Sequence, residues 1–123
     1  MEVYTGQFSK MSQYLAAGLV VCSIARWDPK DYTGCVLKEL APSEELLKGY
    51  QAGQISIAEF TLKFKDQLEQ LDSLEIRAKL EIMSGDSKGI VLCCYEPMTQ
   101  FCHRHLVASY LTVVLGQSVS EFV

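Results

Sequence analysis

The chain alternates between apolar runs typical of buried strands and mixed segments with helical spacing. The segment "EVYT" (2–5) predicts a short strand, and "FSKMSQYLAAG" (8–18) predicts a helix that ends at Gly18. Two continuous apolar runs, "LVVCSIAR" (19–26) and "GIVLCCYE" (89–96), have the pattern of strands buried on both faces of a parallel sheet.

Helix-start signals cluster in the middle of the chain. Ser43 follows a proline and precedes two glutamates, so it predicts the N-cap of a helix over 43–53. Ser56 and Glu59 have the spacing of a capping box for the next helix. The core face of that helix follows a helical period: Phe60, Phe64, Leu68 and Leu71.

Two further segments complete the predicted order. The segment 71–85 alternates like a strand, yet Asp72 and Glu75 form another cap-like pair, and we predict a helix here. A helix from about residue 100 to 115 closes at Gly116, with a core face of Val107, Tyr110, Leu111 and Val114. This order predicts a small Rossmann-like three-layer α/β fold, with a short, mainly parallel sheet flanked by helices.

Length and charge limit the architecture and the partners. The 123 residues suffice for one domain with a core, so we expect a single domain over 1–123. The net charge of −4 makes nucleic acid an unlikely partner, although Arg26, Lys30, Lys38 and Arg104 could form a local basic loop.

The apolar segments and the cysteines bear on location. The start "MEVYTGQFSK" lacks a basic region followed by an apolar stretch, and the run over 15–25 is too short to span a bilayer. We therefore expect a cytoplasmic protein without a membrane partner. The five cysteines are an odd number, and in such a compartment we expect reduced thiols, most of them in the core.

Polar side chains follow both buried strands at their carboxyl ends, where ligands bind in open α/β sheets. Arg26 and Trp27 end the first strand before a loop over 27–35, and Tyr95 and Glu96 end the second. A helix that begins with Cys102, His103 and Arg104 comes soon afterwards. If the strands are neighbours, we expect all seven residues to face one crevice.

These seven residues suit a small anionic ligand. Arg26 and Arg104 could bind a phosphate or carboxylate near a helix N-terminus, and Trp27 and Tyr95 could stack on a flat group. Structural roles remain open for each of them. Arg104 could instead pair with Glu96, Trp27 could close one end of the core, and Cys93 and Cys94 could be core residues.

Cys102 is the candidate nucleophile. A cysteine at a helix N-terminus beside His103 and Arg104 should have a lowered pKa, although contact with a ligand and a structural role are alternatives. The Cys-to-Arg spacing of thiol phosphatase loops is absent. We expect no cofactor and no metal, because His103 and His105 point about 200° apart on a helix and no C-x-x-C pair exists.

Three blocks of this sequence resemble the domain of unknown function 488 family. They are "SIARWDPKDYTG" (23–34), "KELAPSEELLKGYQAGQISIAEF" (38–60) and "IVLCCYEPMTQFCHRHLVASYL" (90–111). The resemblance implies a Rossmann-like fold, a helix over 73–84, and the seven residues above as signature positions. It implies no reaction. Ala25 and Asp28 stand where the family usually has a serine and a proline, so this chain has no hydroxyl at position 25.

We therefore predict a binding protein for a nucleotide or nucleotide-derived anion, which senses or sequesters a signalling nucleotide. A homo-oligomer could deepen its pocket. The alternative is a hydrolase or transferase that uses Cys102 as nucleophile, with His103 or Glu96 as acid or base.

Overall fold

A computed structural model describes residues 1–96 and 101–123 and shows a sheet of five parallel strands. The strand order is β3-β2-β4-β1-β5. The strands are β1 (Val3–Gln7), β2 (Leu19–Ser23), β3 (Cys35–Val36), β4 (Gly89–Cys94) and β5 (Ser120–Glu121). The helices are α1 (Met11–Ala16), α2 (Glu44–Gln51), α3 (Ile57–Glu69), α4 (Ser73–Ser84) and α5 (His103–Leu115), with 3₁₀ turns at Phe8–Lys10 and Lys38–Leu40.

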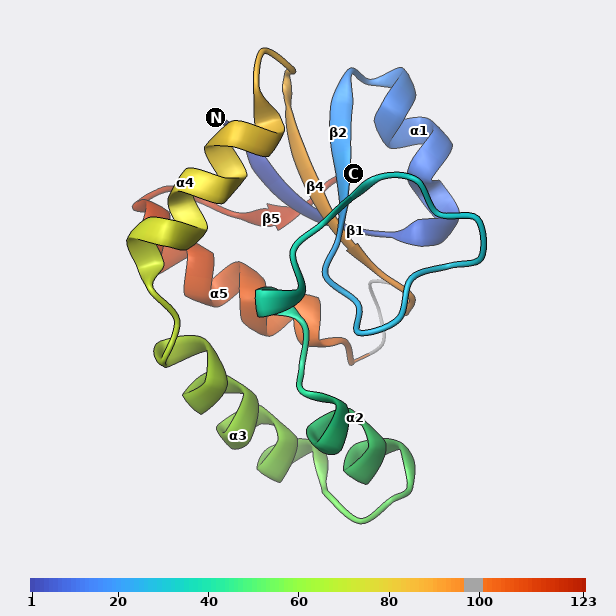
Figure 1. Cartoon of the computed structure of the whole chain (residues 1–123), viewed down its shortest axis with the longest axis vertical. Coiled ribbons are helices and arrows are strands. Elements are labelled where there is room, and N and C mark those ends of the chain that lie inside the picture. The colour runs from blue at the N-terminus through green and yellow to red at the C-terminus, as the bar shows by residue number, and fades with distance from the viewer. Residues whose placement is uncertain (97–100) are drawn as a thin grey trace.

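The helices form layers on both faces of the sheet (Figure 1). Helix α1 packs on one face, while α4 and α5 cover the other. Helices α2 and α3 continue beyond α5, and α3 packs along it. The predicted three-layer α/β fold with a parallel sheet is confirmed.

Side-chain caps start the helices where the sequence predicts them. The hydroxyl of Ser43 accepts from the Leu46 amide, and that of Ser56 accepts from the Glu59 amide. The Asp72 carboxylate accepts from the Leu74 and Glu75 amides, so the segment with strand-like alternation is a helix. The cap satisfies two of the four amides that the first turn of a helix leaves without a partner, and this outweighs a weak alternation of apolar residues.

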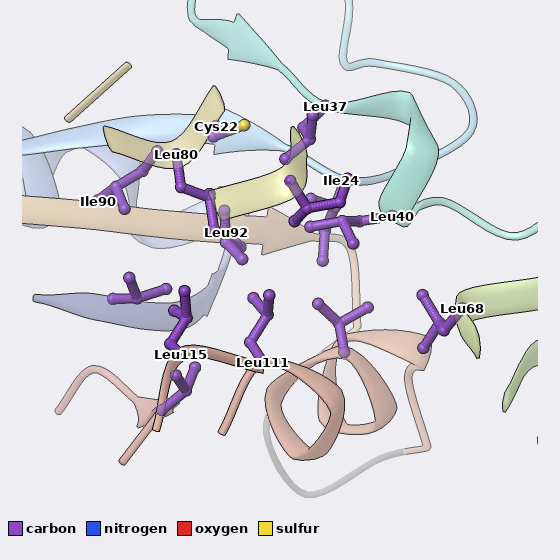
Figure 2. Close-up of a cluster of buried hydrophobic side chains, with 14 of the residues drawn as sticks. Cys22, Ile24, Leu37, Leu40, Leu68, Leu80, Ile90, Leu92, Leu111 and Leu115 are labelled. Atoms are coloured by element: carbon purple, nitrogen blue, oxygen red, sulfur yellow. The ribbon is translucent and has the colours of Figure 1, made fainter. Parts of the chain in front are cut away.

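The strands bury both faces, which explains their continuous apolar sequences. In β4, Ile90 and Leu92 face the core that α4 and α5 cover (Figure 2). Val91 and Cys93 pack in the cluster on the other face, with Tyr14 of α1. From α5, Val107 and Leu111 are fully buried in this core, and Leu115 joins them. The predicted face residues Tyr110 and Val114 are only partly buried.

Some boundaries differ from those predicted. Strand β2 ends at Ser23, so Ile24 to Arg26 form the start of the following loop. Helix α5 begins at His103, and the part of the predicted helix at residue 100 lies outside the described residues. The two-residue strands β3 and β5 are too short to show a periodicity. Within the described residues, every helix is too short or too polar to cross a bilayer.

Candidate functional site

The carboxyl ends of β2 and β4 are neighbours, as the sequence predicts. Ser23 pairs with Cys93 at the end of the parallel ladder, and the Ile24 amide donates to the Cys93 carbonyl. A pocket of about 90 Å³ opens beyond these ends. The loop after β2 contributes Ala25, Arg26 and Trp27 to its lining, and the end of β4 contributes Cys94 with Tyr95 and Glu96 just beyond it. His103 of α5 and Leu47 and Gln51 of α2 complete the lining.

Three larger hollows lie elsewhere on the described surface. One, of about 420 Å³, lies over α2 and α3, and a second, of about 480 Å³, lies between α3 and α5. The third, of about 230 Å³, lies between the segment 36–39 and α4. None of the three is lined by any of the seven predicted site residues. The small pocket is therefore the candidate site, because it collects the titratable and aromatic groups at the sheet edge where ligands of α/β folds bind.

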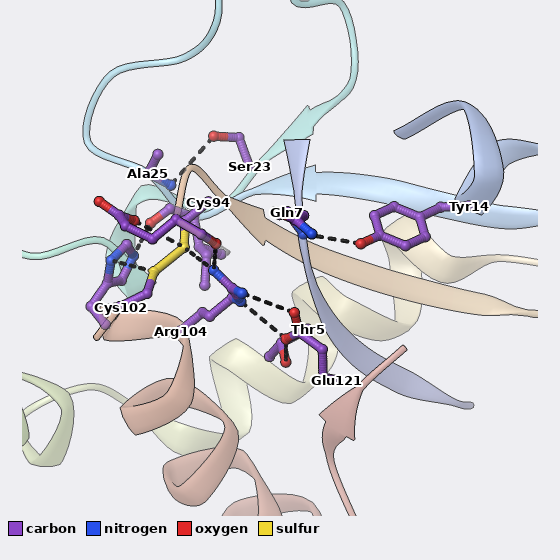
Figure 3. Close-up of a disulfide and its surroundings, with 12 residues drawn as sticks. Thr5, Gln7, Tyr14, Ser23, Ala25, Cys94, Cys102, Arg104 and Glu121 are labelled. Atoms are coloured by element: carbon purple, nitrogen blue, oxygen red, sulfur yellow. Dashed lines mark hydrogen bonds and ion pairs between the residues drawn. A yellow bond between two sulfur atoms is a disulfide. The ribbon is translucent and has the colours of Figure 1, made fainter. Parts of the chain in front are cut away.

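Arg104 is fully buried and organises the back of the site (Figure 3). Its Nε and Nη2 donate to Oε1 and Oε2 of Glu121 at 3.0 and 2.8 Å. Its Nη1 donates to the backbone carbonyl of Glu96 at 2.5 Å and lies 3.1 Å from Sγ of Cys94. Arg104 thus fixes the end of β4 through the Glu96 backbone, and it lies outside the pocket lining.

Glu121 stays ionised to balance this buried cation. Burial alone would raise the pKa of Glu121, but hydrogen bonds from Arg104 and Thr5, with the charge of Arg104, hold the pKa below its usual value. The Thr5 hydroxyl donates to Oε1 at 2.7 Å. Glu121 is not among the residues that the sequence predicts for the site, because its strand is two residues long and nothing nearby in the sequence indicates a partner for Arg104.

Arg26 lines the pocket and has a different kind of partner. Its Nε donates to the Pro42 carbonyl at 2.9 Å, and its Nη2 lies 3.4 Å from the carbonyls of Lys38 and Ala41. Among the described residues, no carboxylate lies within ion-pair distance of Arg26. Its guanidinium therefore keeps a net positive charge beside the pocket.

Two aromatic side chains stand at the rim of the pocket. Trp27 is 45% exposed and Tyr95 is 49% exposed, so neither closes the core. The Tyr95 hydroxyl donates to the Trp27 carbonyl at 2.8 Å and joins the two strand ends, while its ring packs edge-on against Phe8. Both rings keep a solvent-facing surface on which a flat group can stack.

The loop that carries Trp27 is held by a charged cluster. Lys38 Nζ donates to the Ala25 carbonyl at 2.7 Å and to Oδ1 of Asp28 at 2.6 Å. The Ser23 hydroxyl donates to the same Asp28 oxygen at 2.6 Å. Asp28, which replaces the family's usual proline, thus anchors the loop to the end of β2.

His103 is buried and neutral. Its Nε2 donates to the Ile24 carbonyl at 2.6 Å, which leaves Nδ1 unprotonated, 3.8 Å from Sγ of Cys102. Burial, followed by the nearby charges of Arg104 and Arg26, lowers the pKa of His103 to about 4. The imidazole therefore offers a lone pair on Nδ1, on the side of the cysteines.

Cys94 and Cys102 are joined by a disulfide, so the prediction of five reduced thiols is wrong for this pair. The end of β4 and the N-terminus of α5 meet here, which brings the two side chains together in the fold. Cys22, Cys35 and Cys93 are free. Burial raises the pKa of Cys93 to about 12, as expected of a core thiol.

Both bonded cysteines are buried, Cys94 to 1% and Cys102 to 2% exposure, but they differ in their relation to the pocket. Cys94 is one of the residues that line it, whereas Cys102 is not. The sequence predicts Cys94 as a core residue, which its burial confirms, and Cys102 as a candidate nucleophile. The two-residue period of β4 places Cys94 on the same face of the strand as Ile90 and Leu92. This alternation indicates from the sequence that the Cys94 side chain points toward α5.

The same residues group three soft donor atoms. The sulfurs of Cys94 and Cys102 and a ring nitrogen of His103 all lie within 4.8 Å of one another. Glu96 is exposed at the pocket, and its Oε2 lies 3.8 Å from Sγ of Cys94. Five of the seven predicted site residues thus line one pocket: Arg26, Trp27, Tyr95, Glu96 and His103. The other two, Cys102 and Arg104, lie outside the pocket lining.

Open α/β sheets bind ligands in the crevice beyond the carboxyl ends of their strands, and the polar side chains described above lie at that edge of the sheet. The family model described as the active DUF488-N3 subclade (DUF488-N3a) matches residues 13–113. The chain belongs to the DUF488 family. Comparisons with curated proteins and with solved structures find no match.

Proposed function

We propose that this protein binds a small anionic, nucleotide-like molecule in the pocket between the ends of β2 and β4. The observation that carries the proposal is Arg26, which lines the pocket and whose guanidinium, among the described residues, donates to backbone carbonyls alone. Carbonyl dipoles orient the group without neutralising it, so it retains affinity for a phosphate or carboxylate.

The size of the pocket limits what enters it. About 90 Å³ holds a single group such as a phosphate, whereas pockets for whole drug-sized ligands are several times larger. The remainder of the ligand would lie over the rim, where Trp27 and Tyr95 expose their rings. An anionic group linked to a flat ring describes a nucleotide or a nucleotide fragment, which the protein would sense or sequester in the cytoplasm.

A second candidate is a thiol-dependent hydrolase or transferase at the same pocket. It is favoured by Cys94, which lines the pocket and has its sulfur 3.1 Å from Nη1 of Arg104, and by the match to the active DUF488-N3 subclade. In the reduced protein, Glu96 would take the Cys94 proton. The thiolate would attack an electrophilic carbon, the leaving group would take that proton, and water would cleave the new bond and restore the thiol.

A thermal-unfolding screen against nucleotides, cyclic dinucleotides, NAD and its fragments tests the first proposal. A ligand at 100 times its dissociation constant adds about 2.7 kcal/mol, which raises the midpoint measurably. We expect the shift to survive in Arg26→Lys and to vanish in Arg26→Gln. Both variants lose the guanidinium bonds to the carbonyls, but only the second loses the charge.

Arg77→Gln, on the exposed face of α4, is the remote control and should keep the full shift. Mass spectrometry of each ligand after incubation distinguishes the two candidates, because a binder returns the ligand intact and an enzyme converts it. An equal shift in Arg26→Gln and wild type would overturn the anion site.

A further inference from the structure

We propose that Cys94, Cys102 and His103, with both thiols reduced, form a binding site for one zinc ion at the back wall of the pocket. Two thiolates and an imidazole are a donor set that Zn²⁺ prefers. This inference rests on the side-chain cluster and goes beyond the anion-binding proposal, which needs no metal.

The spacing of the donors fits a single ion. The three donor atoms lie within 4.8 Å of one another, and Nδ1 of His103 is 3.8 Å from Sγ of Cys102. Donors that share one tetrahedral zinc are separated by roughly 3.5 to 4 Å. The Cα atoms of Cys94 and Cys102 are 7.6 Å apart, which allows two reduced side chains to reach this separation.

The orientation of His103 is that of a metal ligand. Metal-binding histidines almost always donate their second ring N–H to a carboxylate or carbonyl, which fixes the tautomer and aims the free nitrogen at the ion. Here Nε2 donates to the Ile24 carbonyl at 2.6 Å, and the free Nδ1 faces the sulfurs. The bond spans 79 positions of sequence, so the fold itself sets this orientation.

The charges also balance. Arg104 and Glu121 form a neutral pair behind the cluster, and Nη1 of Arg104 stabilises a thiolate at Cys94. Two thiolates and one Zn²⁺ add no net charge to this buried region, whereas two bare thiolates would be costly there. The charge of the bound Zn²⁺ therefore compensates the two negative charges that form when both cysteines are deprotonated.

The proposed ion would border the pocket. Cys94, His103 and Glu96 all line it, and Oε2 of Glu96 lies 3.8 Å from Sγ of Cys94. Glu96 would supply the fourth ligand or hold a water there. A three-residue site with one exchangeable position is the arrangement of zinc centres that act on substrates, whereas structural centres are closed by four residues.

Anaerobic titration of the reduced chain with Co²⁺, a spectroscopic substitute for Zn²⁺, tests the site without any anionic ligand. We expect a thiolate-to-cobalt charge-transfer band that saturates at one equivalent and is displaced by Zn²⁺. Cys102→Ser and His103→Gln should weaken cobalt binding at least tenfold. Cys35→Ser, which changes a free cysteine outside the cluster, should bind as wild type.

The wild-type chain provides a second comparison that needs no variant. Once oxidised to the Cys94–Cys102 disulfide, it should lose the cobalt band, and reduction should restore it. Absence of the band in the reduced, folded chain would overturn the proposal, as would an undiminished band in the oxidised chain or in folded Cys102→Ser. Because no anion is present, failure here leaves the Arg26-dependent ligand shift to be decided by its own experiment.

Discussion

Arg104, at the start of α5, and Glu121, in the last strand, form a two-pronged ion pair with N–O distances of 3.0 and 2.8 Å. The pair ties the C-terminal strand to the back of the candidate site. Arg104 also bonds the Glu96 carbonyl, so the position of the β4 end depends on a residue 17 positions beyond Arg104.

Glu121→Gln should lower the free energy of unfolding by about 3 kcal/mol, because it leaves a buried guanidinium without its counter-charge. Urea unfolding at neutral pH measures this change. Glu81→Gln is the matched control, since Glu81 pairs with Arg77 on the exposed surface of α4 and should contribute well under 1 kcal/mol. Equal effects of the two substitutions would contradict the structural role of the Arg104 pair.

Stability should fall as the pH drops from about 6.5 toward 4 because of His103. Burial holds the pKa of His103 at about 4, against 6.5 for an ordinary histidine, so only the unfolded chain takes up this proton in that range. Neutral His103 contributes roughly 3 kcal/mol to the free energy of unfolding above pH 6.5, and this contribution is lost as the pH falls to about 4.

Unfolding free energies measured with a metal chelator at pH 7 and pH 5 give the size of this effect. His103→Gln should remove much of the difference, because glutamine does not titrate. His105→Gln is a control from the same helix turn and should keep the wild-type dependence. If the free energy of unfolding of His103→Gln depended on pH as strongly as that of wild type, other groups would take up the proton.

The disulfide predicts the thiol count of the oxidised protein. Denatured without reductant, the chain should present three titratable thiols, from Cys22, Cys35 and Cys93, and after reduction it should present five. Cys94→Ser should release Cys102 and give four thiols in both conditions. Five thiols from oxidised wild type would show that the two sulfurs do not bond.

Asp28 should control the mobility of Trp27. Asp28→Ala removes the acceptor shared by Ser23 and Lys38, and should cost about 1 to 2 kcal/mol and raise acrylamide quenching of the single tryptophan. Asp86→Ala, at the exposed turn after α4, should change neither quantity. Unchanged quenching in Asp28→Ala would mean that the loop holds Trp27 by other contacts.

The regular fold could be predicted from local patterns, since caps and apolar runs act within a few residues. Asp72 is an example: its cap decides a segment in which the alternation is ambiguous. Strands β3 and β5 could not be predicted, because two residues form strands only where a neighbouring strand is already in place.

The site was predictable in part. The two strand ends identify Arg26, Trp27, Tyr95 and Glu96, and the structure brings them to one pocket. The roles of the arginines depend on partners distant in sequence: backbone carbonyls for Arg26 and Glu121 for Arg104. The contact of Cys94 with Cys102 likewise depends on how β4 meets α5, which no local spacing specifies.

The most direct test of the anion-binding account is a fluorescence titration of Trp27, which stands at the pocket rim as the single tryptophan. The nucleotide that gives the largest thermal shift should change this fluorescence saturably in wild type and in Arg26→Lys. In folded Arg26→Gln, affinity should fall at least tenfold. A saturable change of equal affinity in Arg26→Gln, or no response in wild type to any nucleotide tested, would contradict the account.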